Sequence, residues 1–345
     1  MLSHHQIEAA TRIGMLTRER DTASAGAEAL RLLTSALPND ASTLTALDPF
    51  SGAHVRVAGA GGGTDADDTA RSLTETFVGT PSYRKVLAEP LPPSISDEAG
   101  QPYRHSRFYE EHVRPAGFRD AMSGALHHHG RYVGMIHLAA ERPGVFTREA
   151  RHLLASVIPA LAALADPTAR ISDHPDLPDD ASAALVTPDG VLALPGRDRP
   201  AVLDDAAFDC LVREFDASGG HRLRLLWPVG RDWYRVGLAR HALGFPTTLP
   251  HPAVLVHARP TPLPYGLSPR ELDVLTRAAM GHTNQAIAGH LFLSPRTVHS
   301  HIEHMLRKTG CSSRSEATAL AVRDGLLRPA PDSVRHFAEG HTGQF

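Results

Sequence analysis

Residues 267–327 read LSPRELDVLTRAAMGHTNQAIAGHLFLSPRTVHSHIEHMLRKTGCSSRSEATALAVRDGLL, and this stretch carries the start and stop signals of four short helices. Ser268 and Glu271 have the spacing of a capping box, with Pro269 at the first helical position. The next three helices each begin after a hydroxyl residue, at Thr283, Ser294 and Ser313. Two helices joined by a tight turn, the second with one apolar and one polar face, are typical of a helix-turn-helix. The stretch therefore predicts an all-α module of four helices that contains a helix-turn-helix.

Many fixed positions of this stretch are similar to the LuxR-type DNA-binding domain. They are Leu267 to Glu271, Val274-Leu275, Gly281, Thr283-Asn284, Ile287-Ala288, Leu291, Leu293-Ser294, Thr297-Val298, His301, Lys308 and Arg314 to Ala317. The match runs without a gap but covers less than a fifth of the chain. The resemblance implies a sequence-specific transcriptional regulator that binds double-stranded DNA as a homodimer.

The third helix of the stretch is the expected recognition helix. Its apolar residues Val298, Ile302 and Met305 share one face, which leaves a polar face for the major groove. That polar face carries Arg296, His299, Ser300, Glu303 and Arg307. The resemblance implies base-edge contacts from His299, Ser300 and Glu303, phosphate contacts from Thr297 and Lys308, and further backbone contacts from Thr283 and Asn284.

Two residues of the recognition helix depart from the family's usual pattern. Relatives often carry lysine near the positions that hold His299 and Glu303 here. Because glutamate accepts from the exocyclic amine of cytosine whereas lysine favours guanine, we expect a different operator preference. We also expect weaker binding, because neither position carries a fixed positive charge. The alternative for Glu303 is an ion pair with Arg296 or Arg307 at helical spacing.

The fourth helix carries a stripe of small and apolar residues, Ala317, Leu320 and Ala321. The resemblance implies that this stripe forms the dimer contact, and a two-fold dimer reads a pseudo-palindromic site. The alternative is that the stripe closes the core of its own module. The two roles are compatible.

Length and composition are those of an ordinary multidomain protein. The 345 residues leave room for two or three domains, and the formal net charge of −3 gives no bulk attraction to DNA or membranes. Two cysteines, Cys210 and Cys311, indicate a reducing compartment rather than a disulfide framework. Because residues 1–20 lack a signal-peptide core and no apolar run reaches the length of a membrane span, we expect a cytoplasmic protein.

Helical and strand patterns follow one another through the first part of the chain, residues 1–166, at residues 6–18, 25–37, 42–46, 54–59, 67–78, 118–126, 132–140 and 147–165. This order resembles a GAF domain, and the resemblance implies an α+β sensor with a small-molecule pocket on one face of its sheet. Residues 81–100, which contain four prolines, are expected to form a loop. The last helix has an apolar seam that suits either a dimer partner or its own sheet.

The remaining boundaries follow from proline-rich stretches and from the strand pattern. Residues 167–181 are expected to be a linker, and residues 182–259 resemble a small α+β PAS-like connector. Residues 260–327 form the helix-turn-helix domain, and the polar residues 328–345 are predicted to be disordered.

The ligand pocket of the sensor is expected in the segment that covers the sheet in GAF-like domains. Its candidate lining residues are Tyr83, Tyr103, His105, Phe108, Tyr109 and Phe118. Ordinary core packing of these aromatic side chains is the alternative. The sequence names no effector, and a protein partner acting on a sensor without a ligand is an alternative input.

Three motifs that suggest other chemistry lack the residues it needs. Residues 59–63 are glycine-rich but lack the Lys-Ser or Lys-Thr of a phosphate-binding P-loop, so a flexible turn is expected. Neighbouring side chains in His127–His129 point in alternate directions, so we predict a solvated turn and no metal site. The pattern of a phospho-receiver domain is also missing. We therefore expect no cofactor and no enzymatic activity.

Two further alternatives remain from the sequence. An acyl-homoserine-lactone receptor places a similar sensor before the same DNA module, but its pocket tryptophans lie early in the chain, whereas Trp227 and Trp233 lie past residue 200. The other is an enzyme whose activity the DNA module localises, and no catalytic motif favours it.

Overall fold

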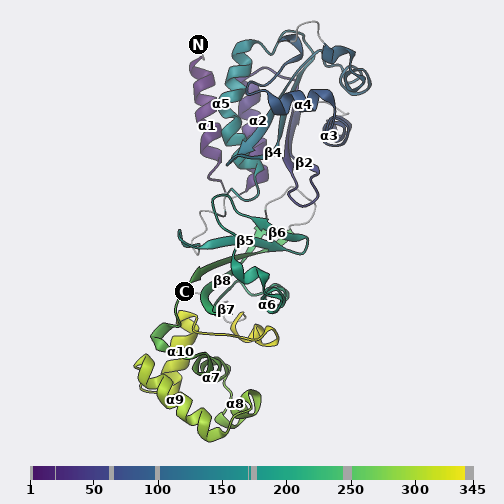
Figure 1. Ribbon diagram of the computed structural model, residues 1–345. Coiled ribbons are helices and arrows are strands. Elements are labelled where there is room, and N and C mark those ends of the chain that lie inside the picture. Colours follow the sequence, from purple (N-terminus) through teal and green to yellow (C-terminus); the bar gives the residue numbers. More distant parts are fainter. Residues whose placement is uncertain are drawn as a thin grey trace. The chain divides into compact units, whose positions relative to one another are not determined.

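The computed structural model describes residues 3–19, 21–61, 66–97, 102–169, 171, 177–243 and 251–338. The chain divides into two compact units, one built mainly from Met1–Arg170 and the other mainly from Ile171–Ala242 and Pro252–Phe345. Figure 1 shows both units. No helix among the described residues combines the length and the apolarity that crossing a membrane requires.

The first unit is built on an antiparallel sheet of four strands in the order β2-β1-β4-β3. The strands are β1 (Ala41–Leu47), β2 (His54–Gly61), β3 (Asp120–His128) and β4 (Arg131–Ala140). One face is covered by α1 (His4–Leu16), α2 (Thr22–Ala36) and α5 (Arg148–Ala165) (Figure 1). The other face carries α3 (Ala66–Glu75), α4 (Pro81–Ala88) and a π-helical turn at Tyr109–Val113. This is the α+β arrangement that the sequence predicted.

Two expectations for the first unit were settled by local packing. The expected loop after Pro81 starts instead with helix α4, because Thr80 caps its N-terminus and proline is favourable at the first helical position. The apolar seam of α5 faces its own sheet, since Leu154, Val157 and Leu161 are all buried within the unit. The seam is thus occupied inside the chain and is not free for a dimer partner.

The second unit begins with an antiparallel sheet of five strands in the order β6-β5-β9-β8-β7. Its strands are β5 (Ser182–Thr187), β6 (Gly190–Ala193), β7 (Arg222–Val229), β8 (Asp232–Leu243) and β9 (His251–Pro260). Helix α6 (Ala206–Ala217) packs on it through Phe208, Leu211 and Phe215. Four helices follow: α7 (Pro269–Ala279), α8 (Asn284–Leu291), α9 (Pro295–Thr309) and α10 (Arg314–Asp324). Figure 1 shows α8, α9 and α10 gathered about α7.

The prediction of a disordered tail is wrong for its first part. Pro331–Ser333 and Arg335–Ala338 form helical turns that contact α6, and Val334 and Phe337 are buried. The apolar spacing of this pair lets a mostly polar segment pack, which composition alone does not reveal. Residues 339–345 lie outside the described part of the chain, as do residues 170 and 172–176 of the expected linker.

The connector sheet and the four-helix module share one hydrophobic core, although the sequence separates them at residue 260. The core runs from Leu225 and Leu226 of β7 to Leu326 and Leu327, which follow α10. The backbone N–H of Leu226 donates to the carbonyl of Leu327 at 2.8 Å. The described residues of both segments therefore fold as one compact unit, because the chain after α10 returns to the edge strand of the sheet.

Candidate nucleic-acid interface and sensor pocket

The helix-turn-helix is formed by α8 and α9 with capped ends. The side chain of Thr283 accepts from the N–H of Ala286, and that of Ser294 accepts from the N–H of Thr297. Phe292 lies between them in the left-handed region, with φ of 53°, and its side chain is 95% exposed. Ile287 of α8 and Ile302 of α9 are buried, so the apolar faces of both helices meet the module core.

The outward face of α9 presents the polar residues that the sequence assigned to it. Six of them are exposed: Arg296, Thr297, His299, Ser300, Glu303 and Arg307. Glu303 pairs with His299, whose Nε2 lies 3.3 Å from Oε1, and not with Arg296 or Arg307. Both side chains of this pair are 64% exposed, so solvent screens it strongly and little free energy opposes its rearrangement.

Lys308 has an intramolecular partner that the sequence did not indicate. Its Nζ donates to Glu271 Oε2 at 2.7 Å and to the carbonyl of Gly266 at 2.8 Å. Burial alone would raise the pKa of Glu271, but the hydrogen bonds from Lys308 and Ser268 outweigh it and lower that pKa. The ammonium assigned to a phosphate thus joins the C-terminal part of α9 to the start of α7.

Asn284 is fixed by an arginine from the fourth helix. Arg314 Nη1 donates to Asn284 Oδ1 at 2.8 Å, and its Nη2 donates to the carbonyl of His282. Arg314 was part of the family resemblance, but its role in orienting the start of α8 could not be derived from its position in the sequence. The contact leaves Asn284 half-buried at the N-terminus of α8.

The expected dimer stripe is mostly interior, as the alternative role in the core of its own module requires. Ala317 and Ala321 have no exposed surface, because they lie one turn apart on the face of α10 that meets α7. Leu320 is half-buried and packs against the same core. The apolar surface that remains outside includes Val322, which is 45% exposed and was not predicted. A spacing of four residues marks a helix face but does not say which side of the helix is covered.

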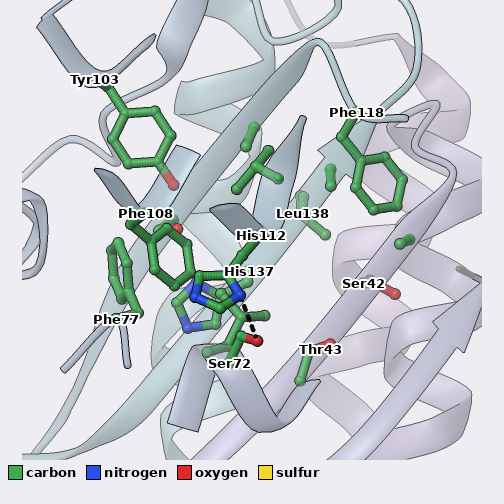
Figure 2. A pocket seen from close by; sticks show the side chains of 16 residues that line it. Ser42, Thr43, Ser72, Phe77, Tyr103, Phe108, His112, Phe118, His137 and Leu138 are labelled. Carbon is green, nitrogen blue, oxygen red and sulfur yellow. Dashed lines mark hydrogen bonds between the residues drawn. The ribbon is translucent and has the colours of Figure 1, made fainter. Parts of the chain in front are cut away.

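The sensor pocket lies between the sheet of the first unit and the segments that cover its open face. Figure 2 shows Phe77, Tyr103 and Phe108 gathered on one side of this pocket and Phe118 on the other. The pocket is partly open to solvent, and the space in it that the centre of a water-sized sphere can occupy is about 50 Å³. Its lining residues, within the part of the chain that is described, include no aspartate, glutamate, lysine or arginine.

Half of the predicted lining residues reach this pocket. Tyr103, Phe108 and Phe118 line it. Tyr83 instead packs edge-on against Phe77 and Tyr132. Tyr109 is buried in the apolar cluster that also contains Phe77 and Val86, and His105 is exposed. Aromatic composition identified the region, but the direction of each side chain depends on the turns between residues 102 and 118.

The polar lining of the pocket was missed, and His137 is its centre. His137 lies on β4 opposite Thr43 of β1 and Ser123 of β3, so the three side chains form one row on the same face of the sheet. Its Nδ1 lies 2.8 Å from Ser123 Oγ, whereas its buried Nε2 has no hydrogen-bond partner among the described residues. Burial, and to a lesser extent the charge of His54, lowers the pKa of His137 to about 3, so the imidazole is neutral at physiological pH.

The remaining candidate motifs have structural roles. Gly59 and Gly61 belong to strand β2 rather than to a turn, and residues 62 and 63 lie outside the described part. His128, expected to be solvated, places Nδ1 2.9 Å from the buried carboxylate of Asp166, which Arg131 also contacts at 2.9 Å. Within the described residues no cluster has the ligands for a metal ion.

Comparisons with known proteins place both modules. Residues 266–321 match the family model of bacterial regulatory proteins of the luxR family, and residues 22–165 match the GAF domain model. The chain is 40% identical over 72 residues to the probable transcriptional regulatory protein NarL of Mycobacterium tuberculosis, covering 21% of this chain and 33% of that protein. It is 44% identical over 61 residues to the HTH-type transcriptional activator RamA of Corynebacterium glutamicum, covering 18% of this chain and 22% of that protein. The chain thus spans about a third or less of the length of these curated relatives.

Among solved structures, a GAF domain from a phosphoenolpyruvate-protein phosphotransferase of Coxiella burnetii is similar to the chain. It is 18% identical with a TM-score of 0.37, and the match covers 47% of this chain and 94% of that one. The two family matches coincide with the two sites described above, the exposed face of α9 and the pocket of the first unit. The chain therefore carries a GAF domain over residues 22–165 and, after it, the DNA-binding domain of the luxR family of bacterial regulatory proteins over residues 266–321.

Proposed function

We propose that this protein is a cytoplasmic, sequence-specific transcriptional regulator that binds DNA as a homodimer under the control of its GAF domain. The observation that carries the proposal is the outward face of α9, an exposed polar surface on a helix that is capped and held by its neighbours. The enzyme alternative has no catalytic constellation to support it among the side chains described above.

The contacts with DNA divide into base readout and backbone positioning. His299, Ser300 and Glu303 are assigned to base edges in the major groove. Arg296, Thr297 and Arg307 are assigned to phosphates, as are the helix-start residues Thr283 and Asn284. Within the described chain the guanidinium groups of Arg296 and Arg307 have no ion-pair partner, which leaves both available, whereas Lys308 is engaged by Glu271.

Control by the sensor follows from a shift between conformational states that hold the two DNA modules differently. The effector is assigned to the GAF pocket. The acyl-homoserine-lactone alternative is not favoured, because Trp227 donates from Nε1 to Asp205 at 3.0 Å and Trp233 lies beneath the guanidinium of Arg328, both in the second unit. Neither tryptophan lines the sensor pocket.

The salt dependence of DNA binding tests the proposal. A duplex is first selected from a random pool by the full chain, and its affinity is measured by fluorescence anisotropy across a salt series. Arg296→Ala and Arg307→Ala should each weaken binding on every sequence and lower the slope of log K against log salt by about one. Arg213→Ala, an exposed arginine of α6, is the matched control and should change neither quantity. Selection of no duplex, or equal slopes for all three variants, would refute the assignment of α9.

A further inference from the structure

We propose that the pocket of the GAF domain takes a compact, uncharged ring compound of the lactam type, whose carbonyl oxygen meets His137 and whose ring N–H meets His112. This inference rests on the proposed function of the domain as the effector site. It adds the chemical class of the effector, which the family matches leave open.

The floor of the pocket has room for a flat ring because three alanines form one row across the sheet. Ala41, Ala139 and Ala121 are paired across β1, β4 and β3. The neighbouring row on the same face holds Thr43, His137 and Ser123. At one end the floor is therefore apolar and carries only short side chains, and at the other end it is polar.

The walls of the pocket are aromatic and are linked ring to ring. Phe77 lies 5.2 Å from Phe108 and 5.4 Å from His137 between ring centroids, and Phe108 lies 5.1 Å from His112. Figure 2 shows these four rings at the end of the pocket where Ser72 also lies. Edge and face contacts of this kind favour a planar π-system over a branched aliphatic ligand.

The hydrogen-bond partners fix which proton each histidine carries, starting with His137. If Ser123 donates to Nδ1, the proton of the ring is on Nε2 and a single donor is left unpaired. With the opposite tautomer both the hydroxyl proton of Ser123 and the Nε2 lone pair are unpaired, which is less favourable. We therefore assign His137 Nε2–H as a buried donor, whose natural partner is a carbonyl oxygen.

His112 has the opposite assignment. The hydroxyl of Ser72 donates its proton to the carbonyl of Asp68 at 2.9 Å, so at 3.0 Å it accepts from His112 Nδ1. The Nε2 of His112 is then an acceptor on the far edge of the ring. A donor from His137 and an acceptor from His112 match the neighbouring C=O and N–H of a cyclic amide.

The charge of the ligand follows from the lining. Within the described chain no lysine or arginine lines the pocket to pair with an anion, and no carboxylate lines it to pair with a cation. A buried charge without a partner is strongly unfavourable. Carboxylate and ammonium ligands are therefore disfavoured.

The test uses the full chain without DNA, so that its outcome is independent of the DNA-binding proposal. Binding of 2-pyridone is measured by ligand-observed NMR and compared with N-methyl-2-pyridone, which keeps the carbonyl but lacks the N–H. Benzoate is the anionic probe of similar size. We expect 2-pyridone to bind about tenfold more tightly than either of the others, because each leaves a pocket group without its hydrogen-bond partner.

Two variants separate the histidines. His137→Phe should weaken binding of both pyridones about tenfold, since it removes the donor to their carbonyl oxygen and keeps a ring of similar shape. It also breaks the contact with Ser123 Oγ, so folding of the variant is checked by thermal unfolding. His112→Phe should weaken 2-pyridone alone and leave N-methyl-2-pyridone unchanged. His105→Ala, an exposed histidine outside the pocket, is the control. Equal binding of benzoate and 2-pyridone, or no binding of 2-pyridone to the folded wild-type chain, would overturn the inference even if a variant failed to fold.

Discussion

The DNA module and the sensor pocket differ in how far apart in the chain their functional residues lie. In the DNA module the caps, the buried face and the exposed face of α9 all come from a run of seventeen residues, Ser294 to Gly310. In the sensor the pocket joins Thr43, Ser72, His112 and His137, which come from four separate segments. A site on one helix follows from local periodicity, whereas a site on a sheet depends on which strands pair and in which register.

The largest expected effect tests whether the segment after α10 belongs to the fold of the DNA module. Phe337→Ala should lower the free energy of unfolding of the second unit by about 3 kcal/mol, because the side chain is buried beside Val334. Urea unfolding followed by tryptophan fluorescence reports this unit, since both tryptophans belong to it. Phe292→Ala removes an exposed ring and should leave the midpoint unchanged. Equal unfolding midpoints for both variants would support the prediction that residues 328–345 are disordered.

The second effect concerns two glutamates of the same module, one buried and one exposed. Glu271 is buried, caps α7 and pairs with Lys308, so Glu271→Ala should lower the free energy of unfolding by about 2 kcal/mol. Glu303→Ala removes an exposed carboxylate and should change DNA binding but not stability. The same urea titration measures both variants. Loss of stability in Glu303→Ala alone would show that Glu303, and not Glu271, stabilises the module.

A third, smaller effect depends on pH and reports on the sensor. Burial opposes ionisation of Asp166, but hydrogen bonds from Thr168 and His128 and the charge of Arg131 lower its pKa overall. Because the folded pKa lies below the unfolded value of about 3.9, its stabilisation is complete above that value and is lost as the pH falls through the folded pKa.

Asp166→Asn should therefore lower stability at neutral pH, and the difference from the wild type should shrink as the pH falls through the folded pKa of Asp166. Hydrogen exchange of the β3 and β4 amides follows this unit at each pH. Asp179→Asn, a fully exposed aspartate, is the control. A stability difference between Asp166→Asn and the wild type that stays constant with pH would show that the charge of Asp166 does not stabilise the fold.

The smallest expected effect concerns the dimer. Val322 is an exposed apolar residue on α10, so Val322→Asp should weaken self-association about tenfold while leaving the fold intact. Sedimentation equilibrium of the full chain measures the dissociation constant. Val191→Asp, on the short edge strand β6, is the control for an exposed valine elsewhere. Unchanged association would move the dimer contact away from the fourth helix.

The sequence by itself determined the four helices of the DNA module and the polar face of its recognition helix. The caps Ser268, Thr283, Ser294 and Ser313 act on backbone groups within one turn, so their signal needs no tertiary partner. The α+β order of the sensor and most of its strands were also predictable from alternation and turn residues. These are the levels at which neighbours in sequence decide the conformation.

Only the tertiary structure decided what those surfaces and side chains touch. Lys308 meets Glu271 across 37 positions, and Ala317 turns inward because α7 lies against it. The pairing of β1, β4 and β3 brings His137 beside Ser123, and no periodicity in the chain indicates that pairing. Contacts between distant segments depend on the simultaneous packing of several elements, and that information is not contained in any single stretch of sequence.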